Sequence, residues 1–265
     1  MDLTPAFFEL WREHRDLKYV DHVRDVFDQA LPDDEWLAAA RREARAKEAY
    51  ATLRLAGVGV GEEESLRTVL DSGITDGVGA VDTGAVLAYR DAHEAALAAA
   101  AEQAAVTPAL LDGLHARLFA GTPGATDATT DAGLAELCDW MATAHDPDDV
   151  HPIVAAAVAH VELLRLRRWE DGNGRLARLA LLLLLSREGY DYYGLLAPSV
   201  HWSDPRKLPS RPAEELPPEQ AETHPAVEHI VHVVEHAVRD MVNWVRAEAS
   251  PGSWQAELFA FPLQP

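Results

Sequence analysis

The chain has 265 residues, 48% of them hydrophobic, which excludes a disordered protein and leaves room for a buried core. Because 44 acidic residues outnumber 23 basic ones, the formal net charge is −21, and such a surface repels nucleic acid and anionic membranes. Cys138 is the only cysteine, so no disulfide can form within the chain, and we expect a cytoplasmic protein. The first residues predict no signal peptide, and the longest apolar run, 179–185, is too short to span a bilayer.

Helix-favouring residues dominate the chain, and alternating β-branched runs are nearly absent. Asp33 and Thr107 are expected to cap helices and Gly189 to end one, whereas 121–130 and 198–218 are expected to be loops, the second mobile and exposed. Because helix follows helix with short connections, the predicted fold class is all-α. Helices are expected over residues 2–16, 18–29, 34–55, 62–71, 80–103, 108–119, 131–144, 151–168, 174–188 and 225–248.

The turn between the helices expected at 151–168 and 174–188 carries the most informative residues. Gly172 and Gly174 flank Asn173, and glycines let backbone N–H groups point into a turn and let a ligand come close. The first N–H groups of a helix lack partners and carry partial positive charge, so this helix start is a candidate cradle for phosphate.

Three charged residues add to that prediction. Arg175 and Arg178 lie three residues apart on the new helix and therefore share a face, and two guanidinium groups suit a polyphosphate. Asp171 lies within the turn and could hold Mg²⁺ between phosphate oxygens. The same residues could instead form a plain glycine turn between packed helices, with Asp171 as a cap and both arginines in solvent.

The turn and its flanking helices resemble the Fic (Fido) family, whose signature is His-Pro-Phe-x-Asp/Glu-Gly-Asn-Gly-Arg-x-x-Arg. The matching residues here are Arg167-Arg168-Trp169-Glu170-Asp171-Gly172-Asn173-Gly174-Arg175-Leu176-Ala177-Arg178. His151-Pro152 and the alanines that follow are similar to the helix before this motif in many members. The resemblance covers residues 100–190 and extends faintly to about residue 48.

The resemblance implies a Fic/Fido helical fold in three parts. Residues 1–60 would form N-terminal helices with a degenerate inhibitory helix, 61–200 the Fic core, and 201–265 a proline-rich loop and a C-terminal helix. Members mostly transfer AMP from ATP to a protein hydroxyl, which implies Mg²⁺ with a nucleotide or other phosphorylated ligand, and a protein partner. The implied roles are metal binding for Asp171, an anion hole for Gly172, Asn173 and Gly174, and outer-phosphate binding for Arg175 and Arg178.

One departure from the signature bears directly on catalysis. The family histidine takes the proton from the target hydroxyl, and its place holds Arg167. A guanidinium stays protonated at any working pH and cannot act as a general base, so we expect AMP transfer to be lost or strongly impaired. Arg167 also adds a cation beside the cradle. Trp169, at the signature's core phenylalanine, is expected to be buried.

A second departure lies upstream. Many members carry an inhibitory Ser/Thr-x-x-x-Glu-Gly motif whose glutamate pairs with the second arginine of the signature. The similar stretch here is Thr52-Leu53-Arg54-Leu55-Ala56-Gly57, with Ala56 in place of the glutamate. Arg178 is therefore expected to be free for a ligand, unless an acid of 62–64 substitutes.

Two further family features are not matched. The family places a β-hairpin before the motif, but 121–130 is too short and too rich in glycine for one. Members often carry a Tyr-Tyr pair near the adenine, and Tyr192-Tyr193 falls too early to be that pair, which leaves adenine specificity open.

Several histidines and the cysteine allow alternatives. His229, His232 and His236 recur along one helix and could bind Zn²⁺, although the apolar stripe beside them favours a polar flank. His201 could replace the missing base if its loop folds over the site, or could simply be exposed. His160 is expected in the core, and Cys138 is expected to be a buried thiol without chemistry.

Three functions follow from these residues. The first is a degenerate Fic protein that binds a nucleotide or other phosphorylated ligand and acts through a partner. The second is an enzyme with altered chemistry on a different phosphorylated substrate. The third is a residual protein adenylyltransferase, which Arg167 makes the weakest of the three.

Overall fold

The computed structural model describes residues 8, 11, 14–29, 32–73, 81–120, 132–143, 150–203 and 223–248. These residues form helices and no β-strand, so the predicted all-α class is confirmed; the one antiparallel bridge within them joins Val60 to Val81. The helices are α2 (Arg15–Phe27), α3 (Asp34–Leu55), α4 (Glu63–Ser72), α5 (Thr83–Ala101), α6 (Pro108–Leu118), α7 (Ala132–Thr143), α8 (Pro152–Leu166), α9 (Asn173–Arg187), α10 (Ser199–Ser203) and α11 (Thr223–Ala247).

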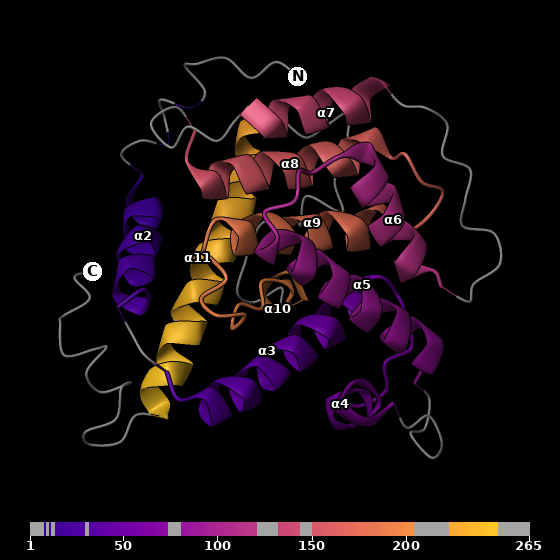
Figure 1. The fold of residues 1–265 in the computed structure, drawn as a ribbon, viewed down its shortest axis with the longest axis vertical. Helices are drawn as coiled ribbons and strands as arrows, with labels where there is room; N and C mark the ends of the chain where they lie inside the picture. The colour runs from indigo at the N-terminus through magenta and orange to yellow at the C-terminus, as the bar shows by residue number, and fades with distance from the viewer. Residues whose placement is uncertain are drawn as a thin grey trace.

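Helix α9 lies at the centre of the molecule. Figure 1 shows α8 and α9 side by side, with α7 beyond α8, α6 and α5 along one flank and α3 along the lower edge. Helix α11 packs against α8 and α2, and α10 lies between α3 and α11. Every residue of α9 from Arg175 to Leu185 is buried, because neighbouring helices cover it on all sides. The turn at the start of α9 therefore leads directly into a fully buried helix.

For helices α2 to α9 and α11, the predicted boundaries are correct to within three residues. The Asp33 carboxylate accepts hydrogen bonds from the backbone N of Glu35 and of Trp36, both at 3.0 Å, and so caps α3. Thr107 caps α6 by accepting from the Leu110 N at 3.2 Å. Gly189 follows α9 with a φ of +79°, which supplies the left-handed residue that commonly ends a helix. These caps are local interactions, so the sequence alone identified them.

The prediction of a mobile exposed loop over 198–218 is wrong for its first residues. Ser199, His201 and Trp202 are buried in α10. The buried carboxylate of Glu48 accepts hydrogen bonds from the Ser199 N at 2.8 Å and from the Ser199 hydroxyl. The polar start of this segment is thus paired inside the protein. Residues 204–218, the loop at 121–130 and most of the helix expected over 2–16 lie outside the described residues.

No helix within the described residues is both long and apolar enough to cross a bilayer.

Candidate functional site

The turn between α8 and α9 is closed by the side chain of Asn173. Its Oδ1 accepts from the Trp169 N at 3.2 Å, and its Nδ2 donates to the Trp169 carbonyl at 2.6 Å. One amide side chain therefore satisfies both backbone groups of the residue four positions earlier. A carboxamide carries its donor and its acceptor on two separate atoms of one planar group, and asparagine, the shorter of the two amide residues, fits this tight turn.

Gly172 is required at the N-cap of α9. Its φ is +80°, and a Cβ built there would lie 2.4 Å from Cε2 and 2.6 Å from Cζ of Phe119. Any other residue would combine a left-handed backbone with a clash against an aromatic ring. The glycine thus lets the turn lie directly against α6.

Helix α6 and the residue after it form a platform under the turn. His115 donates from Nε2 to the Asp171 carbonyl at 2.9 Å, and its ring stacks on Trp169 with centroids 4.9 Å apart. Arg168 forms a two-pronged ion pair with Asp112 of α6, with Nε–Oδ1 and Nη2–Oδ2 distances of 3.1 and 2.9 Å. Trp169 is buried, as expected. No sequence pattern indicated Asp112 and His115, because their partners lie 56 residues further along the chain.

The start of α9 leaves backbone donors without an acceptor in the helix. No side chain caps this helix, and its first backbone hydrogen bond runs from the Leu176 N to the Gly172 carbonyl at 2.9 Å. The N–H groups of Asn173, Gly174 and Arg175 therefore precede the hydrogen-bonded ladder. Together with the helix dipole, such a start can receive an anion.

Arg175 stands behind this helix start in a fixed position. The residue is 7% exposed, and its guanidinium lies over the Phe119 ring, 4.3 Å from the centroid. Burial lowers the pKa of Arg175 from its usual value, and the nearby Asp171 carboxylate opposes this shift. The distance from Arg175 Nη2 to Asp171 Oδ2 is 3.5 Å, a loose ion pair that a phosphate could replace.

Arg178 differs from the expectation that it would be free for a ligand. It is 2% exposed, and it donates from Nε to Thr52 Oγ1 at 2.5 Å and from Nη2 to the Thr52 carbonyl at 3.2 Å. The end of α3 supplies these acceptors, so the stretch that resembles the inhibitory motif does lie against the second arginine. The acids of residues 62–64 do not substitute, since Glu63 and Glu64 pair with Arg67.

Arg167 ends α8 as an exposed residue with φ and ψ of +42° and +42°. This left-handed conformation is uncommon for a residue with a Cβ and turns the chain sharply into the loop. The exposed guanidinium occupies the position at which the resemblance places a histidine.

Asp171 is the one site residue with a largely exposed carboxylate. Its side chain is 78% exposed, and Oδ1 accepts from the Gly172 N at 2.6 Å. No group of three or more histidine, cysteine or acidic residues that could hold a metal occurs within the described part of the chain. The described residues therefore form no metal site of their own. Asp171 fits only an ion that takes most of its ligands from a bound molecule and from water.

Three of the histidines singled out from the sequence, His160, His201 and His229, are buried. His160 is fully buried and stacks on Trp202 with centroids 5.1 Å apart, so its predicted core position is confirmed. His201 is 2% exposed and lies 3.6 Å from Asp240 of α11, so it is neither an exposed loop histidine nor open to a target hydroxyl. His229 is buried and does not lie on a polar flank.

Two other sequence-based expectations concern α2 and α7. The hydroxyls of Tyr192 and Tyr193 donate to the carbonyls of Val20 and Phe27, both at 3.0 Å, so this tyrosine pair holds α2 in place. Cys138 is a buried free thiol, as expected, and burial raises its pKa to about 11.

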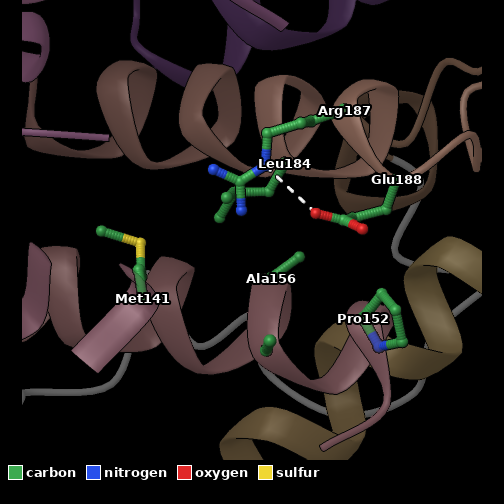
Figure 2. A pocket seen from close by; sticks show the side chains of 7 residues that line it. Met141, Pro152, Ala156, Leu184, Arg187 and Glu188 are labelled. Carbon is green, nitrogen blue, oxygen red and sulfur yellow. Dashed lines mark hydrogen bonds and ion pairs between the residues drawn. The ribbon is translucent and has the colours of Figure 1, made fainter. Parts of the chain in front are cut away.

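A small pocket lies near the other end of α9 from the turn. Figure 2 shows it between Met141 of α7, Ala156 of α8 and Leu184 of α9, with the Arg187–Glu188 ion pair at its edge. Its lining is mainly apolar and includes no residue of the turn. It is therefore separate from the candidate site.

The helical architecture and the glycine turn at the start of its central helix define a protein of the Fic fold. A Fic-family protein from Desulfovibrio desulfuricans G20 superposes with a TM-score of 0.68 over 94% of this chain and 78% of that chain, at 19% identity. Fic-1 from C. elegans, carrying a substitution, gives a TM-score of 0.66 over 86% and 71% of the two chains, at 18% identity. Residues 74–185 match the Fic/DOC family model, and this segment belongs to that family.

Sequence relatives cover only the region around the turn. The protein adenylyltransferase Fic of Nematostella vectensis is 36% identical over 74 residues, which are 24% of this chain and 17% of that protein. The protein adenylyltransferase fic-1 of Caenorhabditis briggsae is 40% identical over 57 residues, 22% of this chain and 11% of that protein. The match thus spans less than a fifth of the length of these relatives.

Proposed function

We propose that this protein binds a nucleotide or another phosphorylated ligand at the start of α9 and that AMP transfer to protein hydroxyls is lost or strongly impaired. The observation that carries the proposal is the uncapped helix start. The N–H groups of Asn173, Gly174 and Arg175 precede the first helical hydrogen bond, and the Arg175 guanidinium is fixed beside them. On a chain with a net charge of −21, such a local concentration of donors favours an anionic ligand.

Mg²⁺ would accompany the ligand. Magnesium in nucleotide sites is held by one or two carboxylates together with substrate phosphates and water, and Asp171 offers one exposed carboxylate beside the cradle. The ion would neutralise phosphate charge and orient the phosphates. Arg175 would then exchange its loose contact with Asp171 for a phosphate oxygen.

The impairment rests on the absence of a suitable base among the residues that surround the turn. Arg167 carries a guanidinium, which stays protonated at working pH. His115, the buried histidine under the turn, commits its Nε2 hydrogen to the Asp171 carbonyl. His160 and His201 are buried. Because general base catalysis contributes about 10²–10⁴-fold, its loss would reduce AMP transfer by a factor of that order.

Action through a protein partner in the cytoplasm is part of this proposal. The relatives are named protein adenylyltransferases. We therefore expect this protein to contact a protein partner near the turn even where AMP transfer is impaired. A second candidate function is an enzyme with altered chemistry on a phosphorylated substrate. The exposed Asp171 carboxylate favours it, since an Mg²⁺ ion held there could polarise a substrate phosphate as well as help to bind it.

Calorimetric titration tests the binding. ATP, ADP, GTP and pyrophosphate would be titrated with and without Mg²⁺ into the wild type, into Arg175→Gln and into Arg117→Gln. Arg117 is an exposed arginine of α6 and serves as the charge-matched control. We expect binding that Arg175→Gln weakens and Arg117→Gln preserves. Equal affinity in all three proteins would refute the cradle, and turnover of the titrated compound would favour the second candidate.

A further inference from the structure

A second hollow, which several charged side chains help to line, lies at the far end of α9, 13 residues and therefore roughly 20 Å along the helix from Asn173. It has a volume of about 420 Å³. Helices α3, α5 and α9 and the segment after α9 line it. It shares no residue with the turn, so an occupant here would be distinct from the ligand of the proposed function.

Three arginines of α3 line this hollow. Arg41 and Arg45 lie one turn apart on the same face, and Arg42 is adjacent. Arg41 donates from Nε to the Tyr193 carbonyl at 2.5 Å, which fixes the guanidinium without neutralising it. Neither Arg41 nor Arg42 forms an ion pair with a carboxylate of the described residues. In a chain with a net charge of −21, two such cations side by side are unusual.

The acidic residues of the hollow are already engaged. Arg45 pairs with Glu94 at 3.1 Å and with Asp71 at 3.3 Å. Asp191 accepts from the Ser186 hydroxyl at 2.7 Å. Among the described residues, neither Glu94 nor Asp191 lies within ion-pair distance of Arg41 or Arg42, so both guanidinium groups remain available to a ligand.

His93 of α5 lines the same hollow and supplies the second observation. It is 8% exposed, and its Nδ1 is buried without a hydrogen-bond partner among the described residues. Burial, with the charge of Arg45 added to it, lowers the pKa of His93 to about 4, so the ring is neutral near pH 7. A buried polar atom without a partner is destabilising, and folded proteins usually satisfy such atoms. Because the His93 ring lines the hollow, an occupant would lie against it.

We propose that this hollow binds a small organic phosphate, with the Arg41 and Arg42 guanidinium groups on its phosphate and the His93 ring beside it. Planar guanidinium groups match phosphate oxygens in pairs, and a phosphate has enough oxygens for both arginines. The hollow is large enough for an organic group to accompany the phosphate. Leu97 and Tyr193 also line the hollow and provide less polar surface for the organic group of the ligand.

Titration of ribose 5-phosphate tests this site, with ribose as the uncharged control. The titrations use the Arg175→Gln background. This substitution is expected to weaken phosphate binding at the start of α9, so that binding in the hollow can be measured separately. Arg41→Gln/Arg42→Gln is the test variant, and Arg54→Gln, an exposed arginine further along α3, is the matched control. Thermal melting of each variant checks that the protein folds.

We expect ribose 5-phosphate but not ribose to bind, and the double variant to lose at least about tenfold in affinity while Arg54→Gln loses none. In histidine-labelled protein, the His93 ring resonances should shift on addition of ribose 5-phosphate. Binding that survives Arg41→Gln/Arg42→Gln would overturn the proposal. So would an absence of binding at concentrations on the order of 10 mM, or equal binding of ribose.

Discussion

The guanidinium of Arg178 bonds both the side chain and the backbone of Thr52, with Nε 2.5 Å from Oγ1 and Nη2 3.2 Å from the carbonyl oxygen. Both residues are buried, and they join α9 to α3 across 126 positions of sequence. Thr52 brings no charge to this contact. The second arginine of the turn therefore donates to a neutral hydroxyl and to a backbone carbonyl at the end of α3.

Thr52→Val should destabilise the protein by about 1–3 kcal/mol. The substitution keeps the volume of the side chain but removes the acceptor of a buried, charged donor, which is costlier than losing an exposed hydrogen bond. Thr68→Val is the control, since the Thr68 hydroxyl only donates to the Glu64 carbonyl on an exposed face of α4. Urea denaturation measures both, and equal stability of the two variants would show that the Arg178–Thr52 contact contributes little.

Ala56→Glu should weaken nucleotide binding, and the effect should vanish in an Arg178→Ala background. Ala56 is the C-cap of α3, one turn beyond Thr52, so a carboxylate there could reach toward the same arginine. Calorimetry with ATP checks both backgrounds, with Thr68→Glu as a control for added negative charge. An unchanged affinity would mean that the end of α3 does not face the ligand.

Gly172→Ala should destabilise the protein by about 2–4 kcal/mol, because it combines a left-handed backbone with a clash against the Phe119 ring. Gly57→Ala separates these two causes. Gly57 has a φ of +72° but nothing within 4 Å of a built Cβ, so about 1 kcal/mol is expected there. Chemical denaturation curves compare the two, and a similar loss at both positions would argue against the close packing of the turn on α6.

Arg167→His should restore some transfer of labelled AMP to protein, since it returns a group that titrates near neutral pH to the end of α8. The wild type should show no detectable labelling. The exposed Arg117→His on α6 controls for a new surface histidine. Strong labelling by the wild type would show that a base other than residue 167 serves the reaction.

Stability should fall as the pH drops below 6.5. Burial, with the charge of Arg178 added to it, lowers the pKa of His160 from 6.5 to about 3, so the unfolded chain binds a proton in this range that the folded protein does not. The stabilisation is therefore complete above pH 6.5 and is lost progressively toward the lowered pKa, by at most about 1.4 kcal/mol per pH unit.

His160→Phe should flatten that pH dependence, because phenylalanine keeps an aromatic ring against Trp202 and removes the titrating group. Urea midpoints between pH 7 and pH 4.5 measure the slope. The same slope in wild type and variant would assign the acid sensitivity to other groups.

Residue order alone was sufficient to predict most of the helices and the local chemistry of the turn. The Asp33 and Thr107 caps reach only two or three residues along the chain, so residue types in order were sufficient to identify them. The glycines and Asn173 likewise act within five residues, and their pattern resembled the Fic signature, which the family match over 74–185 confirms. The substitution at Arg167 was visible in the sequence as well.

Only the tertiary structure decided which partners the buried polar groups find. Arg178 was expected to be free, yet it bonds Thr52, because the packing of α3 on α9 brings the hydroxyl within reach. The buried position of His201 and the platform formed by His115 and Phe119 depend on contacts between distant segments in the same way. Hydrogen bonds of buried groups must be satisfied inside the fold, and which acceptor is near is set by helix packing rather than by spacing along the chain.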